Sequence, residues 1–468
     1  MLLPFKFRHF EDRTLLTSEA GDFLFSDRAI VERILNGALT TEERSRLKQK
    51  RIISEGDGDW RVKSLAVRAR QITRFAPRKI NYLILVPTLR CNLNCSYCQV
   101  SRVDEDAIGF DWTPDTLEKL DRFFAEHAAK KIKIEFQGGE ISLRPDLIRS
   151  VEKIAERYSN SIEIVACSNL FHISKDFEDL FKKENFFIST SLDGNDAEMM
   201  RNRTHNLAAA KRNIKNIRHV LDTYGAEKIA FLPTITEDQK KRPEELIKTY
   251  FDIGTSGIFL RPVNFMGFAR KKHGEAKAGF HEWEQFYRRS LDYIYELNQT
   301  GYFEEFYVAD LIRQVFGDES SALVDFRSPA WFLQNYAVID FDGTIYPSDE
   351  ARMLTRTRTV DLSVGSLGSG LDEDKIAALN STAIHQINSD CMHCAYQPYC
   401  GIDIIDDLSR YGRVDLRKSD TWFCNKQQFL FDWVFEKVKE KNTKWLYIFS
   451  KWLFRSNNPP DNLEVFLD

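Results

Sequence analysis

The chain has 468 residues, of which 43% are hydrophobic and 29% charged, and its 66 basic and 70 acidic side chains give a net charge of −4. This length allows two or three domains with substantial cores. The charge argues against nucleic acid as the main partner, because binding phosphates requires an excess of basic residues. We find neither the apolar core of a secretory signal nor an 18-residue apolar run that would span a membrane. Eight cysteines, most of them in metal-type spacing, fit a reducing compartment, so we expect a cytoplasmic protein.

The first 52 residues form a predicted unit of short strands followed by helices. The strands are expected at residues 2–10, 14–18 and 23–25, and the helices at residues 27–35 and 41–49. This order resembles the small winged-helix peptide-recognition domains of enzymes that modify ribosomal peptides, which capture a leader peptide as an extra strand. A plain structural cap is the alternative. A basic, helix-prone connector follows at residues 61–78, and its charges predict a solvated face.

Three cysteines, Cys91, Cys95 and Cys98, directly follow the apolar run of residues 81–87. The spacing C-x3-C-x2-C places three thiolates on one short loop, which is a metal-ligand arrangement. A structural zinc site uses four closed ligands, whereas a cubane iron–sulfur cluster held by three cysteines keeps one iron without a protein ligand. An open position is typical of a catalytic metal. The loop therefore favours a working cluster over a zinc knuckle whose fourth ligand lies elsewhere.

From residue 79 to about residue 310, apolar runs alternate with helix-prone segments. The predicted strands are residues 80–86, 132–136, 162–166, 186–191, 229–235 and 257–263, with helices at residues 114–129, 146–158, 175–183 and 207–221. Strict alternation of strand and helix predicts a parallel sheet in an α/β fold.

The cysteine loop, with Tyr97 before its last cysteine, resembles the cluster loop of the radical S-adenosylmethionine (SAM) enzymes. The resemblance implies a partial (β/α)6 TIM-type barrel, with the chemistry at the carboxyl ends of its strands. It also implies a [4Fe–4S] cluster whose open iron is chelated by SAM. Reduction of that cluster cleaves SAM to a 5′-deoxyadenosyl radical, which abstracts a hydrogen atom from the substrate.

The second strand ends in Gly138-Gly139-Glu140, which matches the motif that binds the SAM amino group in this family. Glycines allow a close approach of backbone to a ligand, and a carboxylate offsets an ammonium group. The third strand ends in Ser168 and Asn169, whose short polar side chains suit ribose hydroxyls.

The fourth strand ends in Ser191, and Arg203 lies nine residues beyond Gly194. Both match the family's contacts to the SAM carboxylate and ribose, and with Tyr97 they complete the predicted cofactor-binding set. Asp193 and Gly194 are expected to shape the turn. Arg261, at the end of the sixth strand, suits either a SAM or substrate contact or a structural ion pair. Cys167 lies outside both metal motifs and is expected to be an inert core residue.

A second cysteine set, Cys391, Cys394, Cys400 and Cys424, follows a predicted hairpin at residues 336–347 with a tight Asp-Gly turn. Four thiolates close either one iron–sulfur cluster or one zinc ion. His393, inside the first pair, would be an unnecessary fifth ligand, so we expect it to form hydrogen bonds or to face solvent.

This C-terminal pattern resembles the SPASM domain of radical SAM enzymes that act on peptides, which usually carries two auxiliary clusters. SPASM proteins place further cysteines at positions that are Ser348 and Ile404 in this chain. Because these positions would serve the first auxiliary cluster, we expect a single auxiliary [4Fe–4S] cluster and two clusters in total.

The tail from residue 426 is helix-prone, and Trp445, Ile448, Phe449 and Trp452 form one apolar stripe. We expect this stripe to pack on the chain itself or on a subunit rather than on a membrane. The predicted units are a winged-helix-like domain with its connector, a radical SAM barrel, a SPASM-like domain and a helical tail, at residues 1–76, 77–312, 313–440 and 441–468.

The resemblance extends over nearly the whole chain to the B-component radical SAM maturases of His-Xaa-Ser systems, through residues 3–7, 19–24, 97–102 and 346–352. It implies a His-Xaa-Ser precursor peptide as substrate, a second radical SAM protein as partner, and a one-electron reductant such as flavodoxin or ferredoxin.

The bond that the enzyme forms stays open at this point, because fold does not determine function. A side-chain crosslink is favoured, since it returns an electron that the auxiliary cluster could accept. Epimerisation would need a hydrogen donor, for which Cys167 is the cysteine outside both metal sets, and thioether formation is a third product. The sequence also allows a small-molecule radical SAM enzyme or a non-catalytic peptide-binding iron–sulfur protein.

Overall fold

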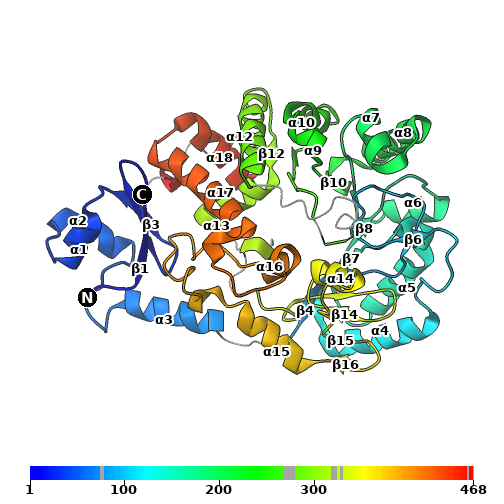
Figure 1. The fold of residues 1–468 in the computed structure, drawn as a ribbon, viewed down its shortest axis with the longest axis horizontal. Coiled ribbons are helices and arrows are strands. Elements are labelled where there is room, and N and C mark those ends of the chain that lie inside the picture. Colours follow the sequence, from blue (N-terminus) through cyan, green and yellow to red (C-terminus); the bar gives the residue numbers. More distant parts are fainter. Residues whose placement is uncertain are drawn as a thin grey trace.

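The computed structural model places a small N-terminal unit at one end of an elongated molecule and the main sheet at the other (Figure 1). It describes residues 1–73, 78–264, 266–267, 280–317, 324–326, 330–460 and 463–466, with side chains of residues 68–73 and 324 not described. Residues 74–77, at the end of the predicted connector, lie outside this set.

The N-terminal unit contains the strands and helices that the sequence predicts. Its antiparallel sheet has the order β1-β2-β3, and its elements are β1 (Phe5–His9), β2 (Thr14–Ser18), β3 (Phe23–Ser26), α1 (Ile30–Leu35), α2 (Thr41–Gln49) and α3 (Trp60–Thr73). Helix α2 begins where expected because Thr40 and Glu43 form a capping box, with the Thr40 hydroxyl accepting from the Glu43 N–H at 3.2 Å. A separate apolar cluster that includes Leu16, Leu24 and Ile30 holds the unit together.

The central sheet has seven strands in the order β10-β9-β8-β7-β4-β13-β14. Its strands are β4 (Ile80–Leu85), β7 (Ala128–Phe136), β8 (Ser161–Cys167), β9 (Phe186–Thr190), β10 (Ile229–Phe231), β13 (Tyr336–Ile339) and β14 (Ile345–Tyr346). All neighbours are parallel except β13 and β14, which form the predicted hairpin. The parallel α/β sheet expected from the alternation of strands and helices is therefore confirmed.

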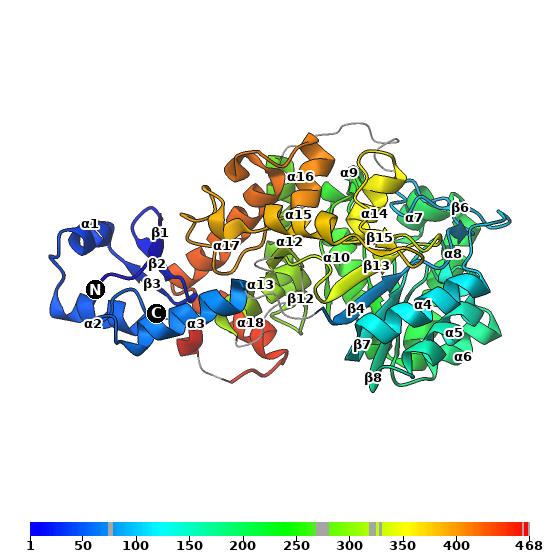
Figure 2. The same cartoon turned by 90° about the horizontal axis from the view of Figure 1, so that it is seen from below.

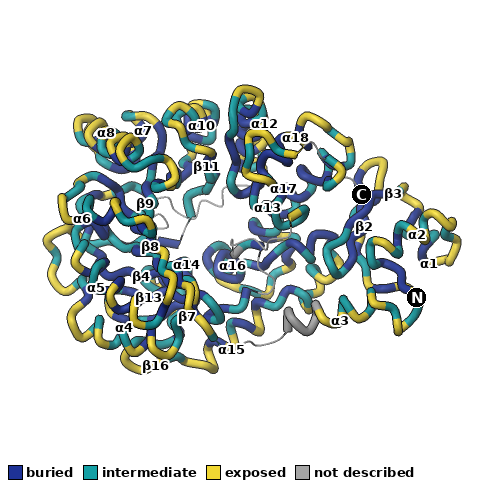
Figure 3. Tube along the Cα trace, turned by 180° about the vertical axis from the view of Figure 1, so that it is seen from behind, coloured by how far each residue is buried: buried dark blue, intermediate teal, exposed yellow. Residues whose placement is uncertain are grey.

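Helices cover the sheet as the alternation predicts (Figures 1 and 2). They are α4 (Pro114–His127), α5 (Pro145–Ala155), α6 (Lys175–Phe181), α8 (Leu207–Tyr224) and α10 (Pro243–Asp252). The strands are largely buried, whereas these helices alternate between buried and exposed residues (Figure 3).

The sixth predicted strand, residues 257–263, does not join this sheet. Its strand β11 (Gly257–Ile258) is short and pairs with β12 (Glu304–Glu305). The Leu260 N–H donates to the Glu305 side chain at 3.0 Å, and Pro262 has no N–H to offer a ladder. An isolated bridge between Ile235 and Pro262 connects this segment to the residues that follow β10. The other edge of the sheet is extended instead by β13, which follows the barrel region in the sequence.

The C-terminal part lies between the sheet and the N-terminal unit (Figure 1). Its helices, together with the two that precede it, are α12 (Phe280–Leu297), α13 (Phe306–Phe316), α14 (Asp349–Arg356), α15 (Glu373–Thr382), α16 (Ile404–Tyr411), α17 (Trp422–Lys439) and α18 (Thr443–Phe454). The predicted apolar stripe of α18 is buried, with Trp452 donating to the Phe303 carbonyl at 3.1 Å. The tail thus packs on the chain itself. None of the described helices is long and apolar enough to cross a membrane.

Candidate functional site

One cavity at the carboxyl ends of the parallel strands collects all the residues predicted to bind the first cluster and SAM. Its walls include the three loop cysteines and every predicted cofactor-binding residue: Cys91, Cys95, Cys98, Tyr97, Gly138, Gly139, Glu140, Ser168, Asn169, Ser191 and Arg203. These residues come from the ends of β7, β8 and β9, from the cluster loop that follows β4 and, for Arg203, from the segment after β9, so the parallel sheet explains why they meet. Their roles as ligands stay predictions.

The cluster loop is held in place by the segment that follows β9. The Ser96 N–H donates to the Asn202 carbonyl at 2.8 Å, and the His205 ring contacts the Asn94 carbonyl at 2.7 Å. Both partners belong to or border the π-helix η2 (Met200–Thr204). Burial raises the pKa of the Cys91 thiol to about 12, so a bound metal cation is needed to stabilise its thiolate form.

The two glycines after β7 line the cavity and also lie against backbone, where a side chain would not fit. A Cβ on Gly139 would lie 2.2 Å from the Arg90 carbonyl oxygen, and one on Gly138 would lie 2.3 Å from the Thr88 oxygen. The Gly139 N–H donates to the Thr88 carbonyl at 3.0 Å, and the Glu140 N–H to the Arg90 carbonyl at 2.8 Å. The motif therefore clamps the strand that leads into Cys91, a role that the sequence alone did not indicate.

Glu140 is buried and already accepts several hydrogen bonds. Ser168 donates its hydroxyl at 2.6 Å, and the backbone N–H groups of Asn169 and Ser142 donate at 2.7 and 3.0 Å. Asn169 in turn donates to the Asn92 side chain at 2.8 Å. The predicted ammonium site and the predicted ribose site are thus one connected network, and it reaches the cluster loop.

Tyr97 lies in a buried network with Asp193 and Arg203. Its hydroxyl donates to the Asp193 carboxylate and accepts from Arg203 at 2.7 Å. Burial raises the pKa of Asp193, while the positive charge of Arg203 opposes that rise. Asp193, predicted only to shape a turn, is therefore an anchor of the cluster loop. Gly194 does shape the turn, with a φ of 121°.

Two further residues line the cavity. The expectation that Cys167 is a core residue is wrong, because its thiol lies on the cavity wall, 3.3 Å from a Glu135 carboxylate oxygen. Strand alternation could have indicated this, because Cys167 at the end of β8 points to the face opposite the buried residues Ile164 and Ala166. Arg261 also lines the cavity, and within the described part of the chain its Nε is buried without a hydrogen-bond partner. This position fits a ligand contact better than a structural ion pair.

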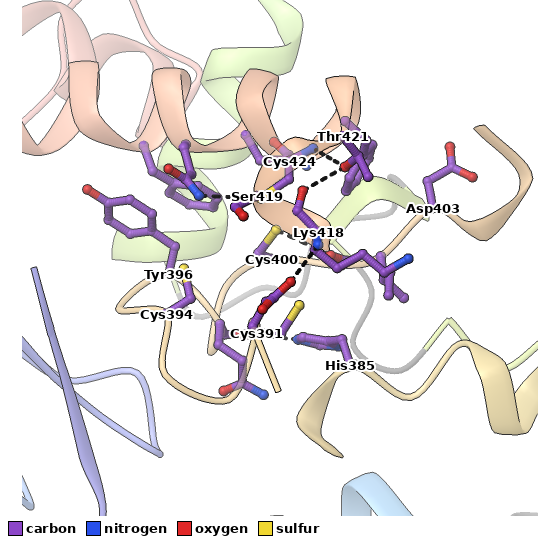
Figure 4. Close-up of a pocket in the computed structure, with 18 of the residues that line it drawn as sticks. His385, Cys391, Cys394, Tyr396, Cys400, Asp403, Lys418, Ser419, Thr421 and Cys424 are labelled. Atoms are coloured by element: carbon purple, nitrogen blue, oxygen red, sulfur yellow. Dashed lines mark hydrogen bonds between the residues drawn. The ribbon is translucent and has the colours of Figure 1, made fainter. Parts of the chain in front are cut away.

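The second cysteine set surrounds a separate cavity (Figure 4). Cys391, Cys394, Cys400 and Cys424 all line it, and Cys424 lies in the first turn of α17. Burial raises the pKa of Cys391 to about 12 and that of Cys424 to about 11. His393 is exposed, as expected of a residue that is not a ligand.

The donor set of this second cavity fits an iron–sulfur cluster. In the described residues, no three Cys, His, Asp or Glu side chains converge on a point that could hold one metal ion. A zinc ion needs its thiolates about 2.3 Å away, whereas the thiolates of a cubane each bind a different iron. Four thiols around one shared cavity are a donor set that an iron–sulfur cluster can use, and the assignment of a cluster rather than zinc stays a prediction.

The two positions that lack the SPASM cysteines have structural roles here. Ser348 caps α14, its hydroxyl accepting from the Ala351 N–H at 3.1 Å. Ile404 is 1% exposed in the main core. Neither residue is available as a thiolate ligand.

Comparison with known families matches residues 85–248 to the Radical SAM superfamily. This part of the chain is therefore a radical SAM domain, and it contains the cluster loop and all the predicted SAM-contact residues. The chain is 27% identical over 184 residues to an uncharacterised protein of Methanocaldococcus jannaschii, covering 38% of this chain and 61% of that protein.

Two characterised proteins are similar over shorter stretches. GTP 3′,8-cyclase of Campylobacter jejuni is 36% identical over 105 residues, covering 21% of this chain and 30% of the cyclase. Neomycin C epimerase of Streptomyces fradiae is 27% identical over 179 residues, covering 38% and 52%. The chain thus spans less than two thirds of the length of each of these relatives.

Solved structures share the fold over most of the chain. Native anSMEcpe with bound AdoMet has a TM-score of 0.60 at 16% identity, covering 77% of this chain and 99% of the other. SuiB of Streptococcus suis, bound to its precursor peptide SuiA, has a TM-score of 0.50 at 14% identity, covering 88% and 97%. At these identities the likeness concerns the fold alone.

Proposed function

We propose that this chain is a radical SAM enzyme that modifies a ribosomally synthesised precursor peptide, with a side-chain crosslink as the product. The observation that carries the proposal is the convergence of three cysteines and eight polar or glycine residues from separate strand ends on one cavity. The chemistry that a SAM-bound [4Fe–4S] cluster supplies there is reductive cleavage of SAM to a 5′-deoxyadenosyl radical, which takes a hydrogen atom from the substrate.

The protein's own residues would hold and orient the cofactor. Cys91, Cys95 and Cys98 are the proposed ligands of the cluster. Glu140 would face the SAM ammonium group, because a buried carboxylate stabilises a cation. Arg203 and Arg261 each have a buried Nε without a partner among the described groups, so they suit the SAM carboxylate or an anionic group of the substrate.

The second cavity would hold one auxiliary [4Fe–4S] cluster on Cys391, Cys394, Cys400 and Cys424. Four thiolates leave no iron open for substrate. A crosslink between two side chains removes two hydrogens from the peptide. One leaves with the deoxyadenosyl group, and the other leaves as a proton with one electron. The auxiliary cluster is the proposed acceptor of that electron, and flavodoxin or ferredoxin is the proposed reductant of the SAM cluster.

The N-terminal sheet supports a peptide as substrate. Strand β1 is one edge of this sheet, and Phe7 on it is 42% exposed. At the other edge, Phe23, Leu24 and Phe25 of β3 are 7%, 2% and 5% exposed. An extended peptide could therefore add to β1 by main-chain hydrogen bonds. The structure of SuiB bound to SuiA also favours a precursor peptide over a small molecule.

We assign the chain to the B-component maturases of His-Xaa-Ser systems, with a His-Xaa-Ser repeat peptide as the precursor and a second radical SAM protein as the partner. Two of the segments that carry this resemblance meet in space, since Arg352 donates to the Val100 carbonyl at 3.4 Å. The proposed division of the chain follows the four predicted units, with the β13–β14 hairpin joining the second and third.

The first experiment is anaerobic iron and sulfide analysis with EPR on the reconstituted protein and on the variant Cys91→Ala, Cys95→Ala, Cys98→Ala. We expect about eight irons in the wild type and about four in the variant, one cubane for each cysteine set. Four irons and one zinc would make the second site structural, and about twelve irons would show that other residues complete a third cluster. Incubation with SAM, dithionite and a synthetic His-Xaa-Ser repeat peptide should give 5′-deoxyadenosine and a peptide that has lost two hydrogens.

Epimerisation is the second candidate, because the Cys167 thiol lines the SAM cavity. A thiol that gives its hydrogen atom to a peptide radical becomes a thiyl radical, which one electron from the auxiliary cluster and one proton would restore. An epimerase would leave the peptide mass unchanged in water and would add one deuterium in D2O. Cys167→Ala would then abolish the product while 5′-deoxyadenosine still formed, whereas a crosslinking enzyme would keep its product.

A further inference from the structure

The N-terminal sheet meets the C-terminal helices beside the second cysteine cavity. Along β1, Phe5, Phe7 and His9 form one stripe, with ring centres 6.5 and 5.2 Å apart. Arg8 points to the opposite face, because side chains alternate along a strand. That face is turned toward α17, where Arg8 contacts a residue 424 positions away.

An acidic and an aromatic residue fix the Arg8 guanidinium. It donates to the Asp432 carboxylate on α17 and lies over the Tyr396 ring, 5.4 Å from the ring centre. The Tyr396 hydroxyl donates to the same carboxylate. Tyr396 stacks on Phe431 and Phe435, with ring centres 4.9 and 5.7 Å away, so the cation rests on a rigid platform.

This platform belongs to the wall of the second cavity. Tyr396 follows Cys394 by two residues, and both line the cavity, side by side in Figure 4. The Arg8 guanidinium is therefore separated from the cavity by the Tyr396 ring, on the side of the cavity where Cys394 lies.

We propose that Arg8 of the N-terminal sheet sets the reduction potential of the auxiliary cluster and so couples the docking of that sheet to electron acceptance. The inference rests on the proposed function, since it takes the four cysteines as cluster ligands. A cluster gains negative charge when it is reduced, so a fixed cation behind the cavity wall stabilises the reduced state and raises the potential. A peptide strand added to β1 would hold the strand that carries this cation.

The test is an EPR-monitored redox titration in the background of Cys91→Ala, Cys95→Ala, Cys98→Ala, where the auxiliary cluster is the one that is left. We expect Arg8→Gln to make the potential more negative by about 59 mV, which is a tenfold change in a one-electron equilibrium. Arg8→Lys should restore most of the wild-type value. Asp432→Asn, which removes the opposing anion, should move the potential in the positive direction.

A matched control joins the turn between β1 and β2 to α17, away from the cysteines. Lys439 of α17 donates to Asp12 at 2.8 Å and lies over the Phe10 ring, and neither partner lines the second cavity. Lys439→Gln should leave the potential unchanged.

Unchanged potentials in Arg8→Gln and Asp432→Asn, with about four irons retained, would overturn the inference. If Arg8→Gln loses its iron, the reduction potential of Asp432→Asn becomes the test. A potential that does not move in the positive direction in that variant overturns the inference. Fewer than about four irons in the background variant itself would instead refute the proposed auxiliary cluster.

Discussion

Arg203 donates a hydrogen bond to the Tyr97 hydroxyl at 2.7 Å, although the two residues are 106 positions apart in the sequence. The same hydroxyl donates to Asp193, and all three residues are at most 6% exposed. The cluster loop, the end of β9 and the π-helix η2 are thereby joined behind Cys95. The position of the cysteines depends on a buried polar network in which every member needs the others.

Tyr97→Phe should weaken this network without changing the packed ring. The change removes one donor and one acceptor and leaves Asp193 and Arg203 buried with one partner fewer, which costs about 1–3 kcal/mol. We expect a lower free energy of unfolding in urea and a loss of iron from the SAM cluster during gel filtration. Tyr447→Phe is the control, because Tyr447 is 40% exposed on α18. Equal effects of the two changes would contradict the role of the network.

Gly139→Ala should remove the SAM cluster and spare the auxiliary one. The added Cβ would lie 2.2 Å from the Arg90 carbonyl oxygen, so the strand leading into Cys91 must move. We expect iron to fall from about eight to about four per chain, and 5′-deoxyadenosine formation to be lost. Gly58→Ala is the control, because a Cβ there meets nothing within 4 Å. Full iron retention in Gly139→Ala would show that the loop can adjust.

The fold was predictable where a local pattern determines the structure. Five of the six expected parallel strands join the central sheet, because each is an apolar run followed by an amphipathic helix. The sixth run, residues 257–263, has a similar composition but contains Pro262, and the Leu260 N–H donates to the Glu305 side chain instead of to a backbone carbonyl of the central sheet. The place at the other sheet edge is taken by β13, which pairs with β4 over some 250 residues of sequence. No local sequence pattern predicts a pairing between strands so far apart in the sequence.

The residues of the candidate site that belong to motifs could be predicted from the sequence, whereas the residues that hold them in place could not. The cysteines and strand-end polar residues follow recognisable spacings. The sequence around Asp193 predicts a turn, since aspartate before glycine is typical of turns. The hydrogen bond between Tyr97 and the Asp193 carboxylate arises only when the chain folds. The glycines after β7 suggest ligand contact, and the sequence does not indicate that they also lie against the carbonyls of Thr88 and Arg90. Cys167 alternates with the buried residues Ile164 and Ala166 along β8, so strand alternation places it on the opposite face, although the cavity itself is completed by loops distant in sequence.

Ser348→Ala should affect stability but not cluster content. The Ser348 hydroxyl caps α14, and loss of such a cap costs about 1 kcal/mol. Urea unfolding should show this loss, whereas iron analysis should still give about eight atoms per chain. Ser381→Ala is the control, because Ser381 is exposed within α15 and its hydroxyl donates to the Ala378 carbonyl. A fall in iron would mean that Ser348 is a cluster ligand.

Glu305 should make the stability of the protein fall as the pH rises toward neutrality. Its carboxyl is buried, and the loss of hydration raises its pKa to about 7, although Tyr287, Leu260 and Val308 donate hydrogen bonds to it. In the unfolded chain a glutamate ionises near pH 4.3. Between about pH 4.5 and pH 7 the folded state therefore keeps a proton that the unfolded state has lost, and raising the pH favours unfolding.

The stabilisation is complete below about pH 4.5 and is lost by about pH 7, and a shift of this size corresponds to about 4 kcal/mol. Urea unfolding of the metal-free protein at intervals from pH 5 to pH 8 measures it. Glu305→Gln has no proton to release, so its free energy of unfolding should fall less over this range than that of the wild type. Because Glu305 holds Leu260, next to Arg261 on the cavity wall, the same ionisation should loosen that wall. Parallel pH profiles for the two proteins would show that Glu305 stays ionised in the folded state.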